Sequence, residues 1–464
     1  MSMMQSALSY YANVLSGYST NIFKLTPQGK TGDIRAGDIV TINLPSASIV
    51  DLRSFKTYFD VATTGTVTRL PPKIDSLFAR VEVLAGGIQL AQGTNFYNVL
   101  RHVKDALCED KTNPVSGHPE LERSIKSLDN IALGNNPEPL ASASTFIGTG
   151  ESAYCVDYWE GFLGSAEPRF LDLSLLPDVQ IRLYMAENSV LTNSTSAAAG
   201  AALVEAEGSA FTDYVAPDGI FTVQNLFATI ECISLSDSSY DQMISDLMSS
   251  QTFLEVPFKA YYAFQQSHTG TSRFQVSSQS IDRIWTTFRY TGANVTGAVA
   301  SGRKYPHTAG GPPVPVLSYT PNPVCESRIA TGLEKYVAPW CCFQSPAADM
   351  DIQWQLNGAF LPQAPMSQTE LLPLSLSSLP PGDFCPDELT MAQYLKSNFV
   401  SCVRLNMHGS EKSRIISGLD SRSSNLTGLM NTSNATVVDF DSMIFVECTS
   451  TLRIEAGKAL SVVA

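Results

Sequence analysis

Only a few residue groups in this 464-residue chain have the side-chain types that catalysis or ligand binding requires. Gln28–Gly29–Lys30–Thr31 is similar to the end of a phosphate-binding loop, in which backbone N–H groups and a lysine hold the phosphates. The position of the leading glycine holds Lys24, however, and no strand–loop–helix pattern surrounds the segment. The sequence also lacks the G-x-S-x-G and H-E-x-x-H motifs. It therefore predicts no phosphate loop, serine nucleophile or zinc-protease helix.

The histidines lack the spacing of a metal site, because none has a cysteine or a second histidine at ligand spacing. A fold could still bring distant ligands together. His102 lies in a helical pattern, which favours a packed or solvent-facing side chain. The five histidines are His102, His118, His268, His307 and His408.

Two small acidic groups are the remaining candidates for a cation or a pair of catalytic carboxylates: Asp349 with Asp351, and His118 with Glu120 and Glu122. The first pair shares one side of a predicted strand, and the second group lies in a polar segment. Solvated carboxylates are the simpler interpretation of both. No group combines a nucleophile, a base and an orienting residue, so we assign no catalytic residue, metal ligand or cofactor.

Aromatic and sulfur-containing residues allow two further functions. Tryptophans could form a carbohydrate platform, but Trp285 and Trp354 lie on alternating strands, where core packing is the usual role. Trp159 and Trp340 complete that set. The nine cysteines form no C-x-x-C motif, which predicts reduced core thiols in a cytosolic setting. They are Cys108, Cys155, Cys232, Cys325, Cys341, Cys342, Cys385, Cys402 and Cys448.

The composition limits the possible partners. Charged residues make up 16% of the chain, against about 25% in average soluble proteins, which suggests surfaces covered by other subunits. The net charge is −14 and no Lys/Arg cluster is present, so direct nucleic-acid binding is not predicted. We find neither a signal peptide nor an apolar stretch of about 20 residues. Five N-x-S/T sequons are interpreted as parts of Ser/Thr/Asn-rich loops: Asn193, Asn294, Asn425, Asn431 and Asn434.

The strongest structural pattern is Ile74–Leu107, which predicts a strand, a turn at Gly86–Gly87, a second strand and an amphipathic helix from Phe96 to Leu107. Strand alternation recurs along the chain. Val179–Met185, Phe221–Leu235 and Phe253–Phe264 show it most clearly, and a helix is expected between the last two. Ser, Thr, Gly and Pro are abundant and helical patterns are few, so the sequence predicts an all-β protein.

Several segments are predicted as long loops because they are polar and rich in glycine or proline. They cover residues 109–165, 187–218, 297–345 and Leu361–Pro386. The chain is expected to end in two short strands, Met443–Cys448 and Thr451–Ile454.

A partial echo of the central stretch appears nearly half a chain length downstream. Ile281–Gly292 can be aligned with Ile74–Ala85, since both begin with Ile-Asp and continue with an aliphatic–aromatic pair. Such an echo is what a duplicated β domain would leave, although the low identity also permits chance.

The order of elements resembles the double jelly-roll major capsid proteins of eukaryotic double-stranded DNA viruses, a lineage of large DNA viruses, virophages and polinton-like viruses. Three segments carry the resemblance: VEVLAGGIQLAQGTNFYNVLRHV, FTVQNLFATIECISLSDSSYDQMISDLM and the terminal FVECTSTLRIEAGKALSVV. It implies an all-β chain with two consecutive eight-stranded antiparallel jelly rolls, long loop insertions and a few short helices. The expected domains are an N-terminal arm (1–20), a first jelly roll (21–235), a linking helix (236–250) and a second jelly roll (251–464).

The resemblance also implies a function. Three chains would form a pseudo-hexagonal capsomer, and capsomers would tile an icosahedral shell, so the protein would be located in the virion and assembled in the host cell. Expected partners are neighbouring capsomers, penton proteins and minor capsid or cement proteins, with an internal membrane as a candidate partner of the N-terminal arm. No catalytic residues come with this family. The alternative is a secreted or surface carbohydrate-binding or carbohydrate-active β-sandwich, for which the sequence offers no carboxylate pair.

Overall fold

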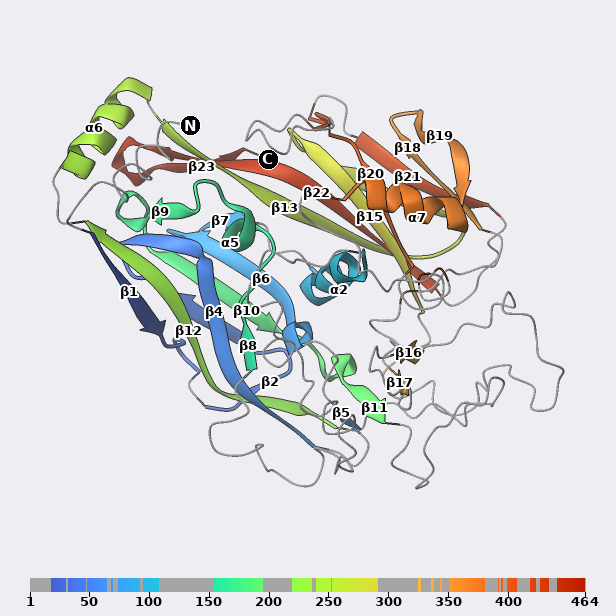
Figure 1. Cartoon of the computed structure of the whole chain (residues 1–464), viewed down its shortest axis with the longest axis horizontal. Helices are drawn as coiled ribbons and strands as arrows, with labels where there is room; N and C mark the ends of the chain where they lie inside the picture. The colour runs from blue at the N-terminus through green and yellow to red at the C-terminus, as the bar shows by residue number, and fades with distance from the viewer. Residues whose placement is uncertain are drawn as a thin grey trace.

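The computed structural model consists mainly of antiparallel strands in two halves (Figure 1). It describes residues 18–30, 32–46, 48–64, 68–69, 74–91, 95–107, 154–194, 219–235, 239–251, 253–290, 324–326, 335–337, 343, 350–379, 391, 394, 399–406, 418–422, 426–433 and 440–463. Within these ranges, no helix has the length and apolar character needed to span a membrane.

The first half is a sandwich of two sheets. One sheet has the order β1 (Tyr18–Leu25), β12 (Phe221–Leu235), β4 (Ile49–Thr63) and β8 (Tyr154–Val156), with β2 (Ile34–Arg35) beside β12 and β9 (Phe170–Asp172) beside β4. The other has the order β3 (Ile39–Asn43), β10 (Val179–Met185), β6 (Phe78–Ala85) and β7 (Ile88–Ala91). Their facing sides form a common core, to which β4 contributes Phe55 and Phe59.

The second half repeats this arrangement. One sheet has the order β13 (Phe253–Ser267), β22 (Phe440–Glu455), β15 (Ile281–Tyr290) and β20 (Val400–Arg404), with β23 (Leu460–Val463) beside β22. The other has the order β14 (Thr271–Val276), β21 (Leu426–Ser433), β18 (Asp351–Leu356) and β19 (Ala359–Ser367). In each half, the two sheet orders just given contain eight main strands, numbered here along the chain. In both halves the first of these pairs with the eighth, the eighth with the third and the third with the sixth. This order defines two jelly rolls and confirms the predicted fold class.

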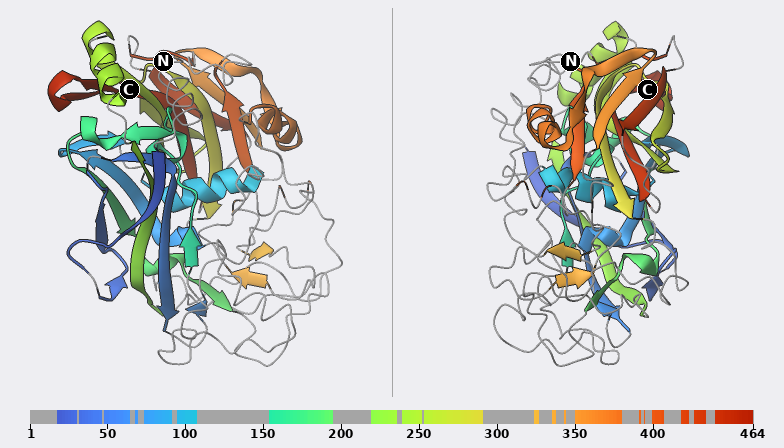
Figure 2. Two further views of the ribbon diagram at one scale, coloured as in Figure 1. Left: turned by 60° about the vertical axis from the view of Figure 1, so that its left-hand side comes forward. Right: turned by 90° about the vertical axis from the view of Figure 1, so that its right-hand side faces the viewer.

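The helices are short and lie outside the sandwiches. They are α2 (Tyr97–Leu107), α5 (Phe162–Ser165), α6 (Ser239–Gln251) and α7 (Gln368–Ser377), with 3-10 turns η1 (Ile74–Leu77), η2 (Leu173–Leu175), η3 (Asn188–Val190) and η7 (Ala456–Lys458). A small sheet of β16 (Val324–Glu326), β17 (Lys335–Val337), β11 (Thr192–Ser194) and β5 (Thr68–Arg69) joins segments of both halves. Helix α2 lies between the two jelly rolls, whereas α7 lies at the far side of the second one (Figures 1 and 2).

The two jelly rolls share their hydrophobic cores instead of being linked only by the chain. Leu254, Val256 and Phe258 of β13 belong to the core cluster of the first jelly roll. Conversely, Leu100 and Val103 of α2 are fully buried in the core cluster of the second. This exchange of apolar side chains holds the two halves together.

The duplication is present in the structure, but the sequence alignment of its halves is wrong. Ile281–Tyr290 forms β15, the third main strand, whose counterpart by sheet position is β4 and not η1–β6. The true counterpart of β6 is β18. Gly86 and Gly87 connect β6 to β7 with φ of 55° and 83°, and Asn357 and Gly358 connect β18 to β19 with 49° and 88°. Both are two-residue turns with positive φ at each position, typical of a tight hairpin.

All four predicted loops contain regular structure, and segment 297–345 includes β16 and β17. Leu361–Pro386 includes most of β19 and all of α7. Its prolines were misleading because β19 is an edge strand, where a missing N–H costs no sheet hydrogen bond. Segment 109–165 contains β8 and α5, and 187–218 begins with η3 and β11. The two predicted terminal strands are one strand, β22, because its polar residues Thr449 and Ser450 continue to pair with β13.

The strands and helix around the midpoint lie close to their predicted positions. β12 and β10 have the predicted bounds, and α6 follows β12. Strand β1 begins at Tyr18, so the predicted arm, residues 1–20, ends inside a strand that pairs with β12. The rest of that arm lies outside the described residues.

Candidate functional site: a buried charged junction

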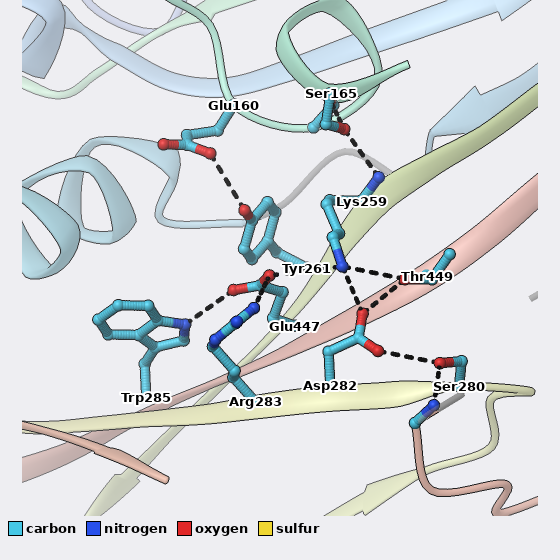
Figure 3. A network of polar contacts seen from close by, with 12 residues as sticks. Glu160, Ser165, Lys259, Tyr261, Ser280, Asp282, Arg283, Trp285, Glu447 and Thr449 are labelled. Atoms are coloured by element: carbon cyan, nitrogen blue, oxygen red, sulfur yellow. Dashed lines mark hydrogen bonds and ion pairs between the residues drawn. The ribbon is translucent and has the colours of Figure 1, made fainter. Parts of the chain in front are cut away.

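The most concentrated polar structure in the described part of the chain lies where the two jelly rolls meet (Figure 3). It contains four acidic and four basic side chains, of which seven are buried and Lys259 is half-buried. The eight are Asp75, Glu160, Asp282 and Glu447, with Arg101, Lys104, Lys259 and Arg283. Equal numbers of opposite charges give this junction a net charge of zero.

The first jelly roll supplies one part of the junction through α2. Arg101 and Lys104 are three residues apart and therefore share a helix face. The Arg101 guanidinium donates to Asp75 (3.1 Å) and to Glu160 (3.3 Å). Lys104 Nζ donates to the second oxygen of Glu160 at 2.8 Å. The Glu160 backbone N–H donates to Tyr97 Oη at 2.8 Å, which fixes the segment that carries this carboxylate.

The second jelly roll supplies the other part through neighbouring strands. Lys259 Nζ on β13 donates to Asp282 Oδ2 at 2.8 Å, and Arg283 Nη1 on β15 donates to Glu447 Oε1 at 3.1 Å. Trp285 Nε1 donates to the other Glu447 oxygen at 3.0 Å. Glu447 therefore accepts two hydrogen bonds from β15, although it lies in an apolar strand.

Tyr261 connects the two parts. It lies on β13, and its hydroxyl donates to Glu160 Oε2 (3.1 Å) and accepts from Lys104 Nζ (3.3 Å). Its phenol is buried, so burial first and the Glu160 charge second raise its pKa well above the usual value. It remains a neutral hydrogen-bonding group at any ordinary pH.

The charged forms of Glu447 and Lys104 are favoured by the opposite charges around them. Burial alone would raise the pKa of Glu447, but Arg283, Lys259 and Lys104 lower it to about 2. Burial likewise opposes the charge of Lys104, but Glu160 raises the pKa of this ammonium well above its usual range. Paired and buried in this way, the charges are suited to fixing the geometry of two domains.

The space beside these charges is small. A cavity of about 20 Å³ lies next to Glu160, Lys259 and Tyr261, which is enough for a single water molecule. It is too small to accommodate a sugar or a nucleotide.

The residues considered in the sequence do not come together in this junction, with the exception of Trp285. His268 is buried against Phe288 and contacts Thr432 Oγ1 at 3.0 Å, and burial lowers its pKa. His102 contacts Ser76 Oγ at 2.8 Å. Asp351 accepts a hydrogen bond from Ser433. The remaining candidates lie outside the described residues: His118, Glu120, Glu122, His307, His408 and Asp349.

The tryptophans and cysteines whose side chains the structure describes belong to the interior. Trp285 and Trp354 are 0% exposed and Trp159 is 2% exposed, so these three form no carbohydrate platform. Trp340 lies outside the described residues. Four cysteines are buried with free thiols, as predicted for core positions: Cys155, Cys232, Cys402 and Cys448. In the part of the chain that the structure describes, no cluster of three or more His, Cys, Asp or Glu residues could hold a metal ion.

No local sequence pattern identifies the charged junction. Its partners are far apart along the chain, as Glu160 and Tyr261 are, and they come together only through the packing of two domains. A usable signal existed in the second half, where Asp282, Arg283 and Glu447 interrupt apolar strands. A charge in such a strand needs a buried partner.

Comparisons with known proteins agree with this architecture. No protein-family model and no curated protein sequence matches the chain. Among solved structures, the chain is similar to the PBCV-1 virus capsid, with 12% identity, a TM-score of 0.56 and 97% coverage of both chains. The Faustovirus major capsid protein has 10% identity, a TM-score of 0.55 and coverage of 95% of this chain and 91% of its own. A chain of the Sputnik virophage has 10% identity, a TM-score of 0.52 and coverage of 97% of this chain and 89% of its own. The chain therefore has the double jelly-roll fold of these viral capsid structures.

Proposed function

We propose that this chain is a structural major capsid protein. Three copies would form a pseudo-hexagonal capsomer, and capsomers would tile the icosahedral shell of a double-stranded DNA virus. The observation that carries the proposal is the pair of jelly rolls with identical strand order, because a trimer of such chains presents six similar units around its axis. Similarity to capsid structures over nearly the whole chain supports it.

The domain assignment is part of this proposal. Residues 21–235 and 251–464 would be the two jelly rolls, with 236–250 as the linking helix and 1–20 as an arm. Two hydrogen bonds between the rolls support a rigid pair: the Tyr261 hydroxyl donates to the Glu160 carboxylate, and the Lys259 backbone N–H donates to Ser165 Oγ. A rigid pair is what a shell-building unit requires. The long insertions would form the outward surface and the contacts between subunits.

We further propose that the protein is located in the virion and has a structural role without catalytic activity. Its partners would be neighbouring capsomers, penton proteins and minor capsid or cement proteins. The N-terminal arm would contact one of these or an internal membrane. If deletion of residues 1–16, which leaves β1 intact, does not change shell assembly or membrane content, the arm has no such role.

The mass of the purified protein in solution tests the main proposal. Size-exclusion chromatography with light scattering should give three times the chain mass of 50.2 kDa, and electron micrographs should show particles with a hexagonal outline. A monomer at all accessible concentrations would overturn the proposal. The carbohydrate-binding alternative is not favoured, and glycan-dependent thermal stabilisation of such a monomer is what would revive it.

A further inference from the structure

One ion pair of the charged junction brings together an amine and a carboxyl group, the two groups that condense to an amide. Lys259 Nζ lies 2.8 Å from Asp282 Oδ2 (Figure 3). The Asp282 side chain is 0% exposed and that of Lys259 is 19% exposed. Glu447 Oε1 lies 3.9 Å from the same ammonium, but Arg283 donates to that oxygen at 3.1 Å. Asp282 is therefore the carboxylate that Lys259 contacts directly.

The two side chains come from strands that are not neighbours. Lys259 lies on β13 and Asp282 lies on β15, and β22 runs between these strands. Adjacent strands are about 4.8 Å apart, so the two backbones are separated by about 10 Å. The long lysine side chain and the short aspartate side chain together span this distance. A bond between them would join the first and third main strands of the second jelly roll across β22.

Thr449 on β22 provides a path for protons between the two groups. It lies opposite Lys259 in the register of β13 and β22. Lys259 Nζ donates to Thr449 Oγ1 at 3.1 Å, and Thr449 Oγ1 donates to Asp282 Oδ2 at 2.6 Å. Oδ2 can therefore receive one proton directly from the ammonium and a second one through the threonine hydroxyl. A carboxyl oxygen that has taken up two protons can leave as water.

The other oxygen of Asp282 is positioned by Ser280. Ser280 Oγ donates to Asp282 Oδ1 at 2.9 Å and accepts from the Gly418 backbone N–H at 2.9 Å, which directs the hydroxyl proton towards the carboxylate. Negative charge collects on Oδ1 when an amine attacks the carboxyl carbon, and a donor that is already in place stabilises that charge. Oδ1 is accordingly suited to become the carbonyl oxygen of an amide.

A second lysine–carboxylate pair in the junction lacks this neutral donor. Lys104 Nζ lies 2.8 Å from Glu160 Oε2, and the Tyr261 hydroxyl contacts both atoms. The other Glu160 oxygen accepts from the Arg101 guanidinium at 3.3 Å. Because arginine is always charged, it favours the ionised carboxylate, which an amine does not attack. Of these two pairs, the one that contains Asp282 is therefore the one suited to react.

We propose that Lys259 and Asp282 condense spontaneously to an isopeptide bond in the folded protein. The bond from Nζ to the Asp282 carboxyl carbon forms, the bond from that carbon to Oδ2 breaks, and two of the three ammonium protons leave with Oδ2 as one water molecule. No oxidant or cofactor takes part. The junction loses one positive and one negative charge, so its net charge stays zero, and Glu447 keeps Arg283 as its partner. This inference goes beyond the proposed capsid role and does not depend on it.

Burial favours the amide over a persistent ion pair. A charged amine and a charged carboxylate are costly away from water, whereas the amide carries no charge. The two groups are already held together, so the condensation avoids the loss of translational freedom that opposes it between separate molecules. The cavity of about 20 Å³ beside Lys259 has room for the water molecule that is released.

The intact mass of the full chain tests this proposal. Mass spectrometry of the purified wild type after prolonged storage should give the sequence mass minus the mass of one water molecule. Lys259→Arg keeps a cation beside Asp282 but cannot form the link, so its mass should equal that calculated from its sequence. Lys104→Arg changes the other buried lysine, and this matched control should show the same loss of one water molecule as the wild type.

Two results would overturn the proposal: a wild type that retains its full mass, or a mass deficit that persists in Lys259→Arg. If Lys259→Arg does not fold, peptides from the digested wild type decide the question. A branched peptide that contains both Lys259 and Asp282 is expected, and recovery of the two residues in separate linear peptides contradicts the link.

The role of the threonine hydroxyl is tested by Thr449→Val, which keeps the shape of the side chain. Without the second proton path, this variant should lose water about 100-fold more slowly than the wild type. The time course of the intact mass measures both rates, and equal rates would show that the protons do not pass through Thr449.

Discussion

The sheets that contain the first strand of each jelly roll share the same order of four main strands and have opposite environments. In β12 of the first roll, buried residues such as Val223 and Ala228 alternate with partly exposed ones such as Thr222 and Thr229. In β15 of the second roll, residues 281–289 are all buried, as are residues 441–448 of β22. The comparison shows that the contact between the domains buries both faces of the second sheet, whereas the first sheet keeps one face partly exposed to solvent. Polar residues on a sheet that is buried on both faces need partners.

The largest expected effect comes from Glu447→Gln, which tests whether the stability of the fully buried sheet depends on its ion pairs. The variant keeps a hydrogen-bond acceptor for Trp285 but removes the charge that neutralises Arg283 and Lys259. An uncompensated buried charge costs about 3–5 kcal/mol. Urea unfolding should show a loss of this size in the free energy of unfolding.

The matched control lies on the same sheet. Glu255 on β13 pairs with Arg453 at 3.0 Å, and both side chains are more than a third exposed. Glu255→Gln should cost less than about 1 kcal/mol, as exposed ion pairs do. If Glu447→Gln and Glu255→Gln lower the free energy of unfolding equally, burial does not increase the contribution of the junction's ion pairs to stability.

The second prediction concerns pH. The pKa of Glu447 in the folded chain is about 2, below its usual value of 4.5, so its contribution to stability is fully present above pH 4.5. It is lost as the pH falls from 4.5 through 2, because the unfolded chain takes up the proton first. The shift corresponds to about 3 kcal/mol. The difference in unfolding free energy between the wild type and Glu447→Gln should therefore shrink across this window, and a constant difference would contradict the ion-pair account.

The smallest effect compares the two hairpin turns. Gly86 and Asn357 occupy equivalent positions with similar positive φ, which asparagine tolerates. A Cβ at Gly86 would lie 2.8 Å from Pro177 Cγ. Gly86→Asn should therefore cost about 1–2 kcal/mol, whereas Asn357→Gly should cost only a few tenths. Thermal unfolding measures both, and equal shifts in Tm would show that backbone conformation alone determines the choice of residue.

The same contrast between half-exposed and fully buried sheets explains which elements can be predicted from the sequence. β10 was predicted with its full bounds because its buried residues Val179, Ile181, Leu183 and Met185 alternate with half-exposed ones. The sequence predicts two strands in place of β22 because the polar residues Thr449 and Ser450 interrupt its apolar run, although both continue to pair with β13. α7 escapes prediction because Pro373 lies inside it and its leucines do not gather on one face of the helix.

The charged junction could not be predicted from local patterns. Arg101 and Lys104 resemble the solvated face of an amphipathic helix, and only the position of the second jelly roll makes that face an interior one. The all-β class was accessible because strand alternation and hairpin signals are local, whereas the double jelly roll was implied by the resemblance of three segments to viral capsid proteins. The contact between domains was not accessible, since it depends on residues as distant as Lys104 and Tyr261.

The zero net charge of the junction also determines how the protein should respond to ionic strength. The chain carries −14, and none of that excess arises from the four acids and four bases between the domains. Dissolved salt screens exposed charges and hardly reaches buried pairs. Added salt should therefore reduce the electrostatic repulsion between copies and leave the angle between the jelly rolls unchanged. Ionic strength would then affect the association of copies without changing the shape of each chain.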